Sequence, residues 1–227
     1  MKNITVVISS CSRLRLLKKS IQSFKESVIS IANLNFVLVE DYVDDPLRRQ
    51  ECRDWIEGNN DIFSKVVYLP TKAGFGKHFQ EAVKNVETDY FFRMEDDQIF
   101  CRKIFLDPLL EVLRSDNKLV SISLRRPNDN RDCIKNLTIN DIEFHQTTFF
   151  SDSLGLFNTS LTRRLIDVCG WNSLLHEKKV MTPASNKLKL KKLVLGKKHK
   201  FRPSSVHYVH EGINERQGSY NFIASSL

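Results

Sequence analysis

Short apolar runs alternate with helical patterns through the first hundred residues of this chain of 227 residues, and this alternation limits the fold most strongly. Runs rich in β-branched and aromatic residues occupy positions 4–8, 35–39, 66–69 and 89–94, and helical patterns follow the first three. Such runs predict buried strands. Strands that alternate with helices imply right-handed crossovers between parallel neighbours. We therefore expect an α/β fold with a mixed, mainly parallel, Rossmann-type central sheet flanked by helices.

The second half of the chain predicts a different mixture of elements. Helices are expected at 104–114 and 160–168, and strands at 119–124, 144–150 and 153–157. Residues 125–140 are polar and irregular, which predicts a surface loop over the site. Residues 176–198 predict a basic helix preceded by a loop, and residues 201–208 predict an extended segment. We expect a single domain of residues 1–227, because a chain of this length can bury a full core.

The fourth apolar run ends in three consecutive carboxylates, Glu95, Asp96 and Asp97. Ligand sites in open α/β sheets lie beyond the carboxyl ends of such strands. Adjacent carboxylates repel one another unless a cation lies among them, and Mg²⁺ and Mn²⁺ prefer carboxylate and phosphate oxygens. The triplet therefore predicts a metal site that holds a phosphorylated substrate. A solvated acidic loop is the alternative interpretation.

Polar or glycine-containing loops also follow the other predicted strands. Residues 9–13 follow the first strand, and Glu40 and Asp41 follow the second. Gly74 and Gly76 precede the third helix, where glycine permits close backbone approach and the first amides of the helix can receive phosphate. Because parallel strands end at one edge of a sheet, these loops predict a nucleotide site there, although a plain turn also explains the two glycines.

Basic residues outnumber acidic residues by 35 to 27, which leaves a net charge of +8. The excess is concentrated from Lys187 to Arg202, where eight of sixteen residues are Lys or Arg and none is acidic. A solvated helix face is one interpretation of this segment. Contact with an anionic lipid surface and contact with nucleic acid are the two functional interpretations.

Three features bear on where the chain resides. Its apolar runs are shorter than a membrane span, and its first residues lack the small-residue cleavage site of a signal peptide. Its five cysteines are scattered without the paired spacing of a metal site, which favours free thiols in a reducing compartment. We therefore expect a cytoplasmic protein without a transmembrane segment, with peripheral membrane or nucleic-acid contact through residues 187–202.

The order of these motifs resembles that of family-2-type glycosyltransferases, which have the GT-A fold. Residues 4–13 resemble the first strand and loop of that family. Glu40-Asp41, the segment with Gly74 and Gly76, and the acidic triplet fall at its base-binding acid, its glycine loop and its DxD metal motif. Residues 154–172 resemble its acceptor-side segment, and residues 202–210 resemble its terminal strand with a metal-binding histidine.

The resemblance implies transfer of a sugar from a nucleotide-diphosphate donor of the UDP type to an acceptor hydroxyl, with inversion. Residues 1–100 would form the nucleotide-sugar-binding half and residues 101–227 the acceptor-binding half. The acceptor would be a glycan, a lipid-linked sugar or a hydroxymethylated base in viral DNA. A nucleic-acid-binding module with a degenerate nucleotide-sugar site is the alternative function.

The resemblance also implies roles for individual residues. The nucleotide-sugar-binding residues would be Ser9, Ser10, Arg13, Asp41, Gly74, Lys77, Glu95 and Asp96, with Asp41 at the uracil-type base, Lys77 at the diphosphate and Asp96 at the ribose or sugar hydroxyls. The ligands of Mn²⁺ or Mg²⁺ would be Asp97, Glu95 and His210. A metal that bridges diphosphate oxygens would stabilise the charge that develops on the leaving phosphate.

An inverting transferase also needs a carboxylate that takes the proton from the acceptor hydroxyl. The family places this carboxylate in a Glu-Asp pair, whereas the corresponding residues in this chain are Ser185 and Asn186, which cannot serve. Glu177 and Asp152 are the nearest carboxylates that could replace it, and they are the two candidates for the catalytic base.

Overall fold

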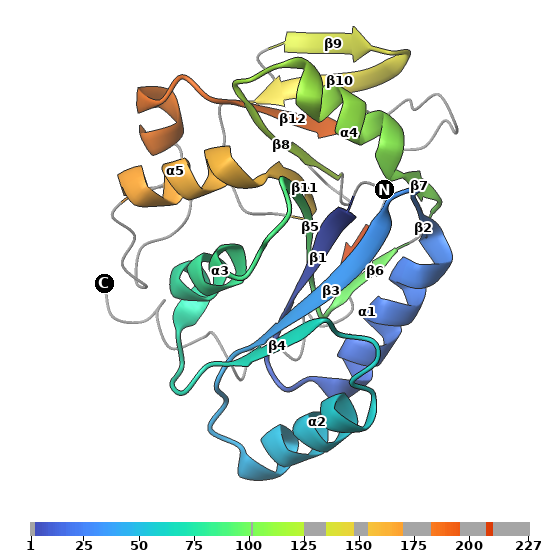
Figure 1. Ribbon diagram of the computed structural model, residues 1–227, viewed down its shortest axis with the longest axis vertical. Coiled ribbons are helices and arrows are strands. Elements are labelled where there is room, and N and C mark those ends of the chain that lie inside the picture. Colours follow the sequence, from blue (N-terminus) through green and yellow to red (C-terminus); the bar gives the residue numbers. More distant parts are fainter. Residues whose placement is uncertain are drawn as a thin grey trace.

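The computed structural model describes residues 3–100, 102–124, 135–147, 154–169, 183–195 and 208–210. The first half of the chain contributes four long strands to the central sheet: β1 (Asn3–Ser10), β3 (Asn33–Glu40), β4 (Lys65–Tyr68) and β5 (Tyr90–Glu95). They pair in parallel in the order β4, β3, β1, β5 (Figure 1). The four strands predicted for residues 4–94 are therefore confirmed.

The second half of the chain extends the same sheet. Its strands are β8 (Leu119–Ser123), β9 (Lys135–Ile139), β10 (Ile142–Thr147), β11 (Gly155–Asn158) and β12 (Lys191–Leu195). They continue the sheet beyond β5 in the order β11, β8, β12, β10, β9, and only β8 and β12 pair in parallel. The fold is thus α/β with a mixed central sheet flanked by helices, as expected, and its parallel character lies mostly in the first half.

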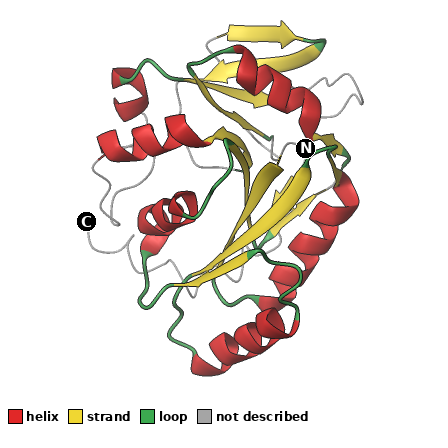
Figure 2. Ribbon diagram, viewed as in Figure 1, coloured by secondary structure: helices red, strands yellow, loops and turns green. Residues whose placement is uncertain are grey.

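Among the described residues, five helices of ten or more residues cover the two faces of the sheet (Figure 2). They are α1 (Leu14–Ser27), α2 (Pro46–Gly58), α3 (Gly74–Lys84), α4 (Leu106–Ser115) and α5 (Thr159–Cys169). Apolar residues of α1, α2 and α4 pack in one core with Phe92 and Leu156, and those of α3 and α5 pack in a second core with Phe91 and Phe157. The alternation along β5 and β11 therefore separates two apolar layers, as expected for strands that are covered on both faces.

Local sequence signals account for several helix boundaries. The side chain of Asp45 accepts a hydrogen bond from Arg48 N at 3.1 Å, and Pro46 occupies the first position of α2, so this helix has the usual start signals. In α1 the residues Leu17, Ile21 and Phe24 are buried at helical spacing. The predicted helices of the first half, and the helices predicted at 104–114 and 160–168, are confirmed.

Two shorter sheets lie beside the central one. β6 (Gln98–Phe100) pairs antiparallel with β13 (Tyr208–His210), and β2 (Val28–Ile29) pairs in parallel with β7 (Ile104–Phe105). The first of these pairs sets the backbone of His210 opposite Gln98, immediately after the acidic turn. Of the extended segment predicted at 201–208, residues 201–207 lie outside the described residues, and Tyr208 begins β13.

Two predictions for the second half are wrong. The basic helix predicted at 176–198 is replaced, in its described part, by a short helix at 183–187 and by β12, which is hydrogen-bonded to β8 on one side and to β10 on the other. The surface loop predicted at 125–140 contains β9, which forms a hairpin with β10. Asn140 and Asp141, the two turn residues, have φ values of 50° and 60°, as a tight type I′ hairpin requires.

Candidate functional site

The carboxyl ends of β1, β3 and β5 bring three polar loops together. Ser9 pairs with Glu95 and Ser10 pairs with Glu40 in the parallel ladders. The residues that follow stay attached to β1, because Asp41 N donates to Ser10 O at 2.8 Å and Asp96 N donates to Ser9 O at 2.9 Å. We call this group, residues 9–13, 40–41 and 95–97, the carboxyl edge.

Asp96 is the most heavily bonded side chain of the carboxyl edge. Its Oδ2 accepts hydrogen bonds from Ser10 Oγ at 3.2 Å, from Cys11 N at 3.2 Å and from Arg13 Nε at 3.1 Å. Its Oδ1 accepts a further bond from Arg13 Nη2. Asp96 is fully buried, so these bonds tie the turn after β5 to the loop between β1 and α1.

The guanidinium of Arg13 bridges two carboxylates. Its Nη1 lies 3.2 Å from Asp97 Oδ2, while its other side holds Asp96, and all three side chains are buried. Burial would lower the pKa of Arg13, but the charge of Asp96 raises it well above its usual value. Burial raises the pKa of Asp96 in spite of the opposing effect of Arg13. The protein itself therefore supplies a cation, the guanidinium of Arg13, to two carboxylates of the acidic triplet.

Glu40 makes a second buried contact with the loop after β1. Its Oε1 accepts hydrogen bonds from the backbone amide and the hydroxyl of Ser12, the latter at 2.8 Å. Its Oε2 is buried without a partner among the described residues. Burial raises the pKa of Glu40 to about 7, and the nearby polar groups of Ser10 and Ser12 oppose that rise. This carboxyl holds the loop after β1 through Ser12.

Asp41 connects the loop after β3 to the start of α3. Its Oδ1 accepts hydrogen bonds from Tyr42 N at 2.8 Å and from Ala73 N at 2.9 Å. Burial raises the pKa of Asp41, and these two amide donors act against the rise. The side chain predicted to bind the base is thus held in place by two backbone groups beside the first turn of α3.

Glu95 lies on the opposite face of β5 from the acidic neighbours that follow it. Phe91, Arg93 and Glu95 share the face of the sheet that α3 covers, and Arg93 Nη1 lies 3.3 Å from Glu95 Oε1. The same face holds His78 of α3, whose Nε2 hydrogen-bonds to Val39 O at 3.1 Å. Burial and the nearby Arg93 lower the pKa of His78 to about 4, so this imidazole is neutral at physiological pH.

The first turn of α3 points to the carboxyl edge. It has no side-chain cap, and Gly74 has a φ of 68°, a conformation that favours glycine. Ser9, on the face of β1 that α3 covers, has a buried hydroxyl without a partner among the described residues. Lys77 is exposed in the same turn. Uncapped amides, a free hydroxyl and a cation form a suitable receptor for phosphate.

Most of the predicted site residues lie at or beside the carboxyl edge, and some lie elsewhere or outside the described residues. Ser10, Arg13 and Asp96 are in direct contact, and Asp41 and Gly74 lie on either side of Ala73 N. Glu95 is turned towards Arg93. Asp152 and Glu177 lie outside the described residues, and for His210 only the backbone is described.

The sequence reasoning missed the partners within the site. It did not foresee the Arg13 bridge, the Ser12–Glu40 contact or the Arg93–Glu95 pair. The period of two along β5 could have found the last of these, because it places Arg93 and Glu95 on one face. The first two join residues that are far apart in the chain and give no local signal.

The described side chains do not form a metal site by themselves. No group of three or more His, Cys, Asp or Glu side chains among them is placed to hold a metal ion. Both oxygens of Asp96 accept hydrogen bonds from the protein, and Glu95 is directed to Arg93, which leaves Asp97 as the carboxylate closest to the expected role. The described part of the carboxyl edge therefore does not fit a resident Mn²⁺ or Mg²⁺ ion.

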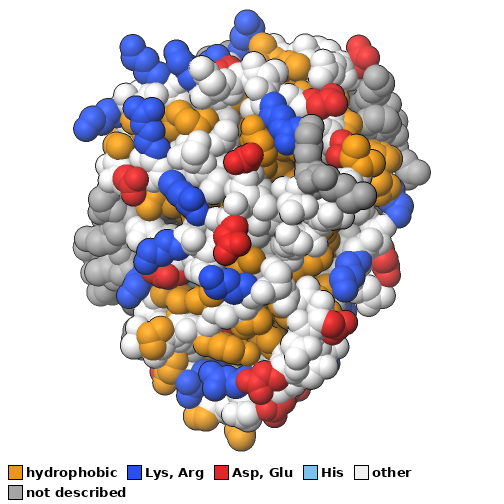
Figure 3. Space-filling model, in the orientation of Figure 1, with side chains coloured by type: hydrophobic (Ala, Val, Ile, Leu, Met, Phe, Trp, Pro, Cys, Tyr) orange, Lys and Arg blue, Asp and Glu red, His pale blue; other side chains and the backbone are white. Residues whose placement is uncertain are grey.

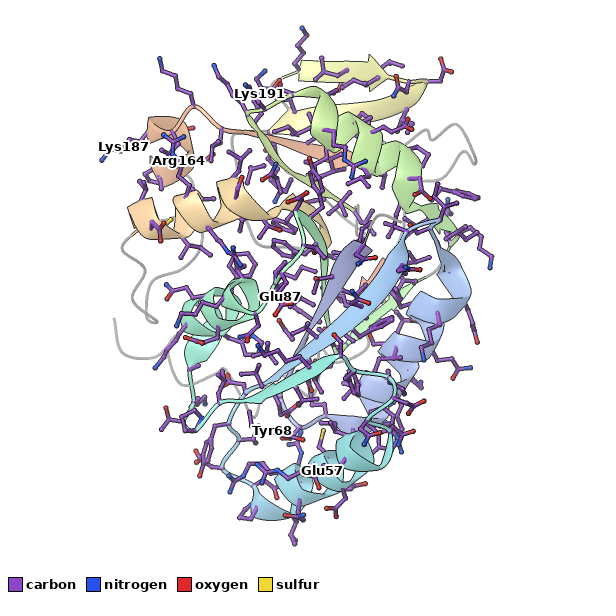
Figure 4. All side chains as sticks on the ribbon, viewed as in Figure 1. Glu57, Tyr68, Glu87, Arg164, Lys187 and Lys191 are labelled. Atoms are coloured by element: carbon purple, nitrogen blue, oxygen red, sulfur yellow. The ribbon has the colours of Figure 1, made fainter. Side chains whose placement is uncertain are left out.

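Exposed basic side chains lie away from the carboxyl edge. In the segment from Lys187 to Leu195, Lys187, Lys189 and Lys191 are exposed, whereas Lys192 is buried. Blue side chains are grouped at the top and upper left of Figure 3, and Figure 4 labels Lys187, Lys191 and Arg164 in that region. Lys191 Nζ lies 2.6 Å from Asp116 Oδ2, so part of this charge is paired.

Comparison with known proteins identifies the family of the chain. The sequence model of glycosyl transferase family 2 matches residues 5–175, and the chain belongs to this family. No curated protein sequence matches it significantly. Among the described helices none is long and apolar enough to cross a membrane.

Solved structures share the fold of the chain. A crystal structure of TarS 1–349 from S. aureus in complex with UDP-GlcNAc has a TM-score of 0.62 and 15% identity, and the match covers 92% of this chain and 58% of that one. A crystal structure of GalNAc-T7 with UDP, GalNAc and Mn²⁺ has a TM-score of 0.64 and 8% identity, and the match covers 85% of this chain and 42% of that one. The chain thus has the GT-A fold of these glycosyltransferases and spans less than two thirds of their length.

Proposed function

We propose that the chain is a glycosyltransferase that moves a sugar from a nucleotide-diphosphate donor, of the UDP type, to an acceptor hydroxyl with inversion. The observation that carries this proposal is the match to glycosyl transferase family 2 over residues 5–175, which includes the whole carboxyl edge. TarS with UDP-GlcNAc and GalNAc-T7 with UDP, two structures of the same fold, support the choice of a uridine nucleotide. In this proposal residues 1–100 bind the donor and residues 101–227 bind the acceptor.

The donor would lie across the carboxyl ends of β1 and β3. Asp41 would accept a hydrogen bond from the base through Oδ2, because its Oδ1 already holds two backbone amides. Ser9 would offer its unpartnered hydroxyl, and the uncapped amides of α3 with Lys77 would meet the diphosphate. The hydroxyl and the amides can donate hydrogen bonds to phosphate oxygens, and the lysine carries a positive charge. Both would stabilise the negative charge that develops on the diphosphate as the sugar leaves.

The acceptor hydroxyl must lose its proton during the transfer. Glu177 or Asp152 would take that proton, as the resemblance to the family suggests, and each must lie within hydrogen-bond reach of the acceptor oxygen. For the acceptor we propose a glycan, a lipid-linked sugar or a hydroxymethylated base in viral DNA. The exposed lysines at 187, 189 and 191 would attract the anionic lipid or nucleic acid that carries it.

The proposed roles of the donor-site residues do not depend on a divalent metal ion, although the sequence predicted one. Mn²⁺ is present in the GalNAc-T7 structure, and Asp97, Glu95 and His210 remain the predicted ligands in this chain. Such an ion would neutralise charge on the diphosphate. Because the described carboxylates do not converge, the roles given above are those of the protein's own groups.

The test is calorimetric titration with UDP on the wild type and on two lysine variants of α3. Lys77→Met removes the cation at the first turn and should weaken UDP binding about tenfold, a change of about 1.4 kcal/mol. Lys84→Met is the matched control, because Lys84 is exposed at the other end of the helix and pairs with Glu81. Equal UDP affinity in all three proteins would show that the diphosphate does not bind at the first turn of α3.

The alternative function makes different predictions. A nucleic-acid-binding module would bind DNA with a steep salt dependence, and replacement of Lys187 and Lys189 by Met would reduce that binding. It would bind neither UDP nor other nucleoside diphosphates. Failure of a panel of nucleoside diphosphates to bind, with or without Mn²⁺, would overturn the transferase proposal in favour of this module.

A further inference from the structure

Arg13 is fixed at both ends between β1 and α1. Its carbonyl oxygen accepts hydrogen bonds from Leu16 N and Leu17 N, each at 2.9 Å, so its backbone is part of the start of α1. Its side chain extends to the turn after β5, where it meets Asp96 and Asp97. Only 7% of the residue is exposed. The guanidinium is therefore held in one place before any ligand binds.

Both oxygens of Asp96 are engaged by donors of the protein. Oδ2 accepts hydrogen bonds from Ser10 Oγ, Cys11 N and Arg13 Nε, and Oδ1 accepts one from Arg13 Nη2. Breaking these bonds would also leave the buried Arg13 with one carboxylate fewer. Asp96 consequently acts as the anchor of Arg13 in this structure.

The three carboxylates of the acidic triplet point to different partners. Glu95 faces Arg93 on the α3 side of the sheet, Asp96 holds one edge of the Arg13 guanidinium, and Asp97 holds another nitrogen of it. A hard divalent ion is usually bound by carboxylates that converge, together with substrate phosphates. Here two of them converge on a guanidinium.

We propose that Arg13 is the resident cation of the donor site, so that the chain binds a nucleoside diphosphate without a divalent metal ion. This inference rests on the proposed function, since it concerns the same donor. Arginine has five N–H groups, and three of those of Arg13 bond to carboxylate oxygens, so two N–H groups are not used by carboxylates among the described residues. Guanidinium is always charged and matches the geometry of phosphate.

The physical advantage of this arrangement is that the charge is already in position. The buried carboxylates orient Arg13, and its fixed dipoles do not have to reorganise when charge develops on the leaving diphosphate. A metal ion would instead have to displace Arg13 from Asp97 or share that carboxylate with it. The two cations therefore compete for the same carboxylate.

The first experiment uses the wild-type chain alone. UDP is titrated calorimetrically into protein in excess EDTA and into protein with excess MnCl₂, and Mn²⁺ bound to the protein is measured separately by electron paramagnetic resonance. We expect UDP affinities that agree within about twofold and no Mn²⁺ bound beyond that which UDP binds by itself. UDP binding that appears only with Mn²⁺ overturns this inference and leaves the proposed donor site standing. Absence of UDP binding in both conditions, with other nucleoside diphosphates failing as well, overturns the proposed function instead.

Two variants sharpen the result. Arg13→Lys keeps the charge but loses the forked geometry, and it should weaken UDP binding in EDTA about tenfold. Arg13→Gln removes the competitor for Asp97, and in this variant Mn²⁺ should restore UDP binding that EDTA abolishes. Arg15→Gln is the matched control, because Arg15 is an exposed arginine in the first turn of α1 and should leave UDP binding unchanged.

Folding of the variants is checked by near-ultraviolet circular dichroism before titration. If Arg13→Gln does not fold, the wild-type comparison in EDTA and MnCl₂ and the Arg13→Lys titration decide the matter. Arg13→Lys that binds UDP in EDTA as tightly as the wild type would overturn the assignment of Arg13 to the diphosphate.

Discussion

The two halves of the central sheet gather their polar groups differently. In the parallel half, β1, β3, β4 and β5 all run in one direction, so their carboxyl ends and the loops that follow lie at the same edge. Arg13, Glu40 and Asp96 come from three different loops and meet there in the interior. The common strand direction thus brings together polar side chains that are spread over almost ninety residues of sequence.

In the other half, strand directions alternate and the groups are dispersed. β11 runs antiparallel to both β5 and β8, and β10 runs antiparallel to both β9 and β12. Gly155 of β11 approaches the backbone of β8 closely, and Lys191 pairs with Asp116 at the surface. The comparison teaches that the parallel half carries the site because its strands end together, whereas the mixed half mainly completes the scaffold.

The largest effect should come from Asp96→Asn, which removes the main anion of the buried Arg13. Breaking a buried ion pair by changing one partner typically costs about 3 to 5 kcal/mol. Asp97→Asn is the matched comparison, and it should cost less because Asp97 has one ion-pair contact with Arg13 where Asp96 has a two-point contact. Urea denaturation of the three proteins measures the free energies of unfolding. Losses below about 1 kcal/mol for both variants would contradict the role of Arg13 in holding the carboxyl edge.

Gly155→Ala should have the next largest effect, and it tests the contact between β11 and β8 within the mixed half. A Cβ at this position would lie 2.2 Å from Ile122 O and 2.8 Å from Ser123 Cα, and these are backbone atoms of β8 that cannot rotate away. We expect a loss of about 3 kcal/mol in the free energy of unfolding, measured by urea denaturation, because overpacking forces the strands apart.

Gly58→Ala is the control for this change. Gly58 ends α2, and no atom lies within 4 Å of the position that an added Cβ would take, so alanine should raise stability by up to about 1 kcal/mol through its helix propensity. A Gly155→Ala protein as stable as the wild type would show that β11 and β8 can move apart without loss of stability, and close packing of these two strands would then not be required.

The parallel half was predictable from the sequence, and the other half was so only in part. Residues 4–8 and 35–39 have the composition of buried strands and are followed at once by helical patterns, so local signals were sufficient. The helix prediction was wrong at β12, because only long-range pairing with β8 and β10 makes this segment a strand. The hairpin of β9 had a local signal, Asn140-Asp141, which the sequence reasoning did not use.

The site was predictable as a place and less so as a set of contacts. The polar ends of predicted parallel strands located the carboxyl edge, since such ends must meet. The Arg13–Asp96 contact joins residues 83 positions apart, and it depends on the exact course of two loops. A sequence that shows three acids therefore indicates the need for a cation without telling whether that cation is a metal or an arginine.

Glu40→Gln tests the buried carboxyl of the parallel half through pH. The pKa of Glu40 rises from 4.5 to about 7 on folding because of burial, so the folded state takes up a proton in this range. The stability of the wild type should therefore fall as pH rises from about 4.5 to about 7, by up to about 3 kcal/mol from this group. The variant lacks this proton uptake, so its stability relative to the wild type should increase over the same range.

Urea denaturation of both proteins at about pH 5 and about pH 8 measures the difference. His78 has the opposite effect, because its pKa falls to about 4 on folding and stability rises with pH as the unfolded imidazole loses its proton. Both proteins contain His78, so its contribution cancels when they are compared. A difference that does not change with pH would show that Glu40 is ionised in the folded protein.

The smallest effect should come from Lys191→Met in the mixed half. Lys191 and Asp116 are 2.6 Å apart, but their side chains are 44% and 31% exposed, and solvent and salt screen such a pair. We expect a loss below about 1 kcal/mol that vanishes at high salt, measured by urea denaturation. Lys187→Met is the control, because Lys187 is exposed on the short helix just before β12. A salt-independent loss above about 2 kcal/mol would mean that Lys191 fixes the register of β12 against β8, and the mixed half would then depend on a charged contact just as the parallel half does.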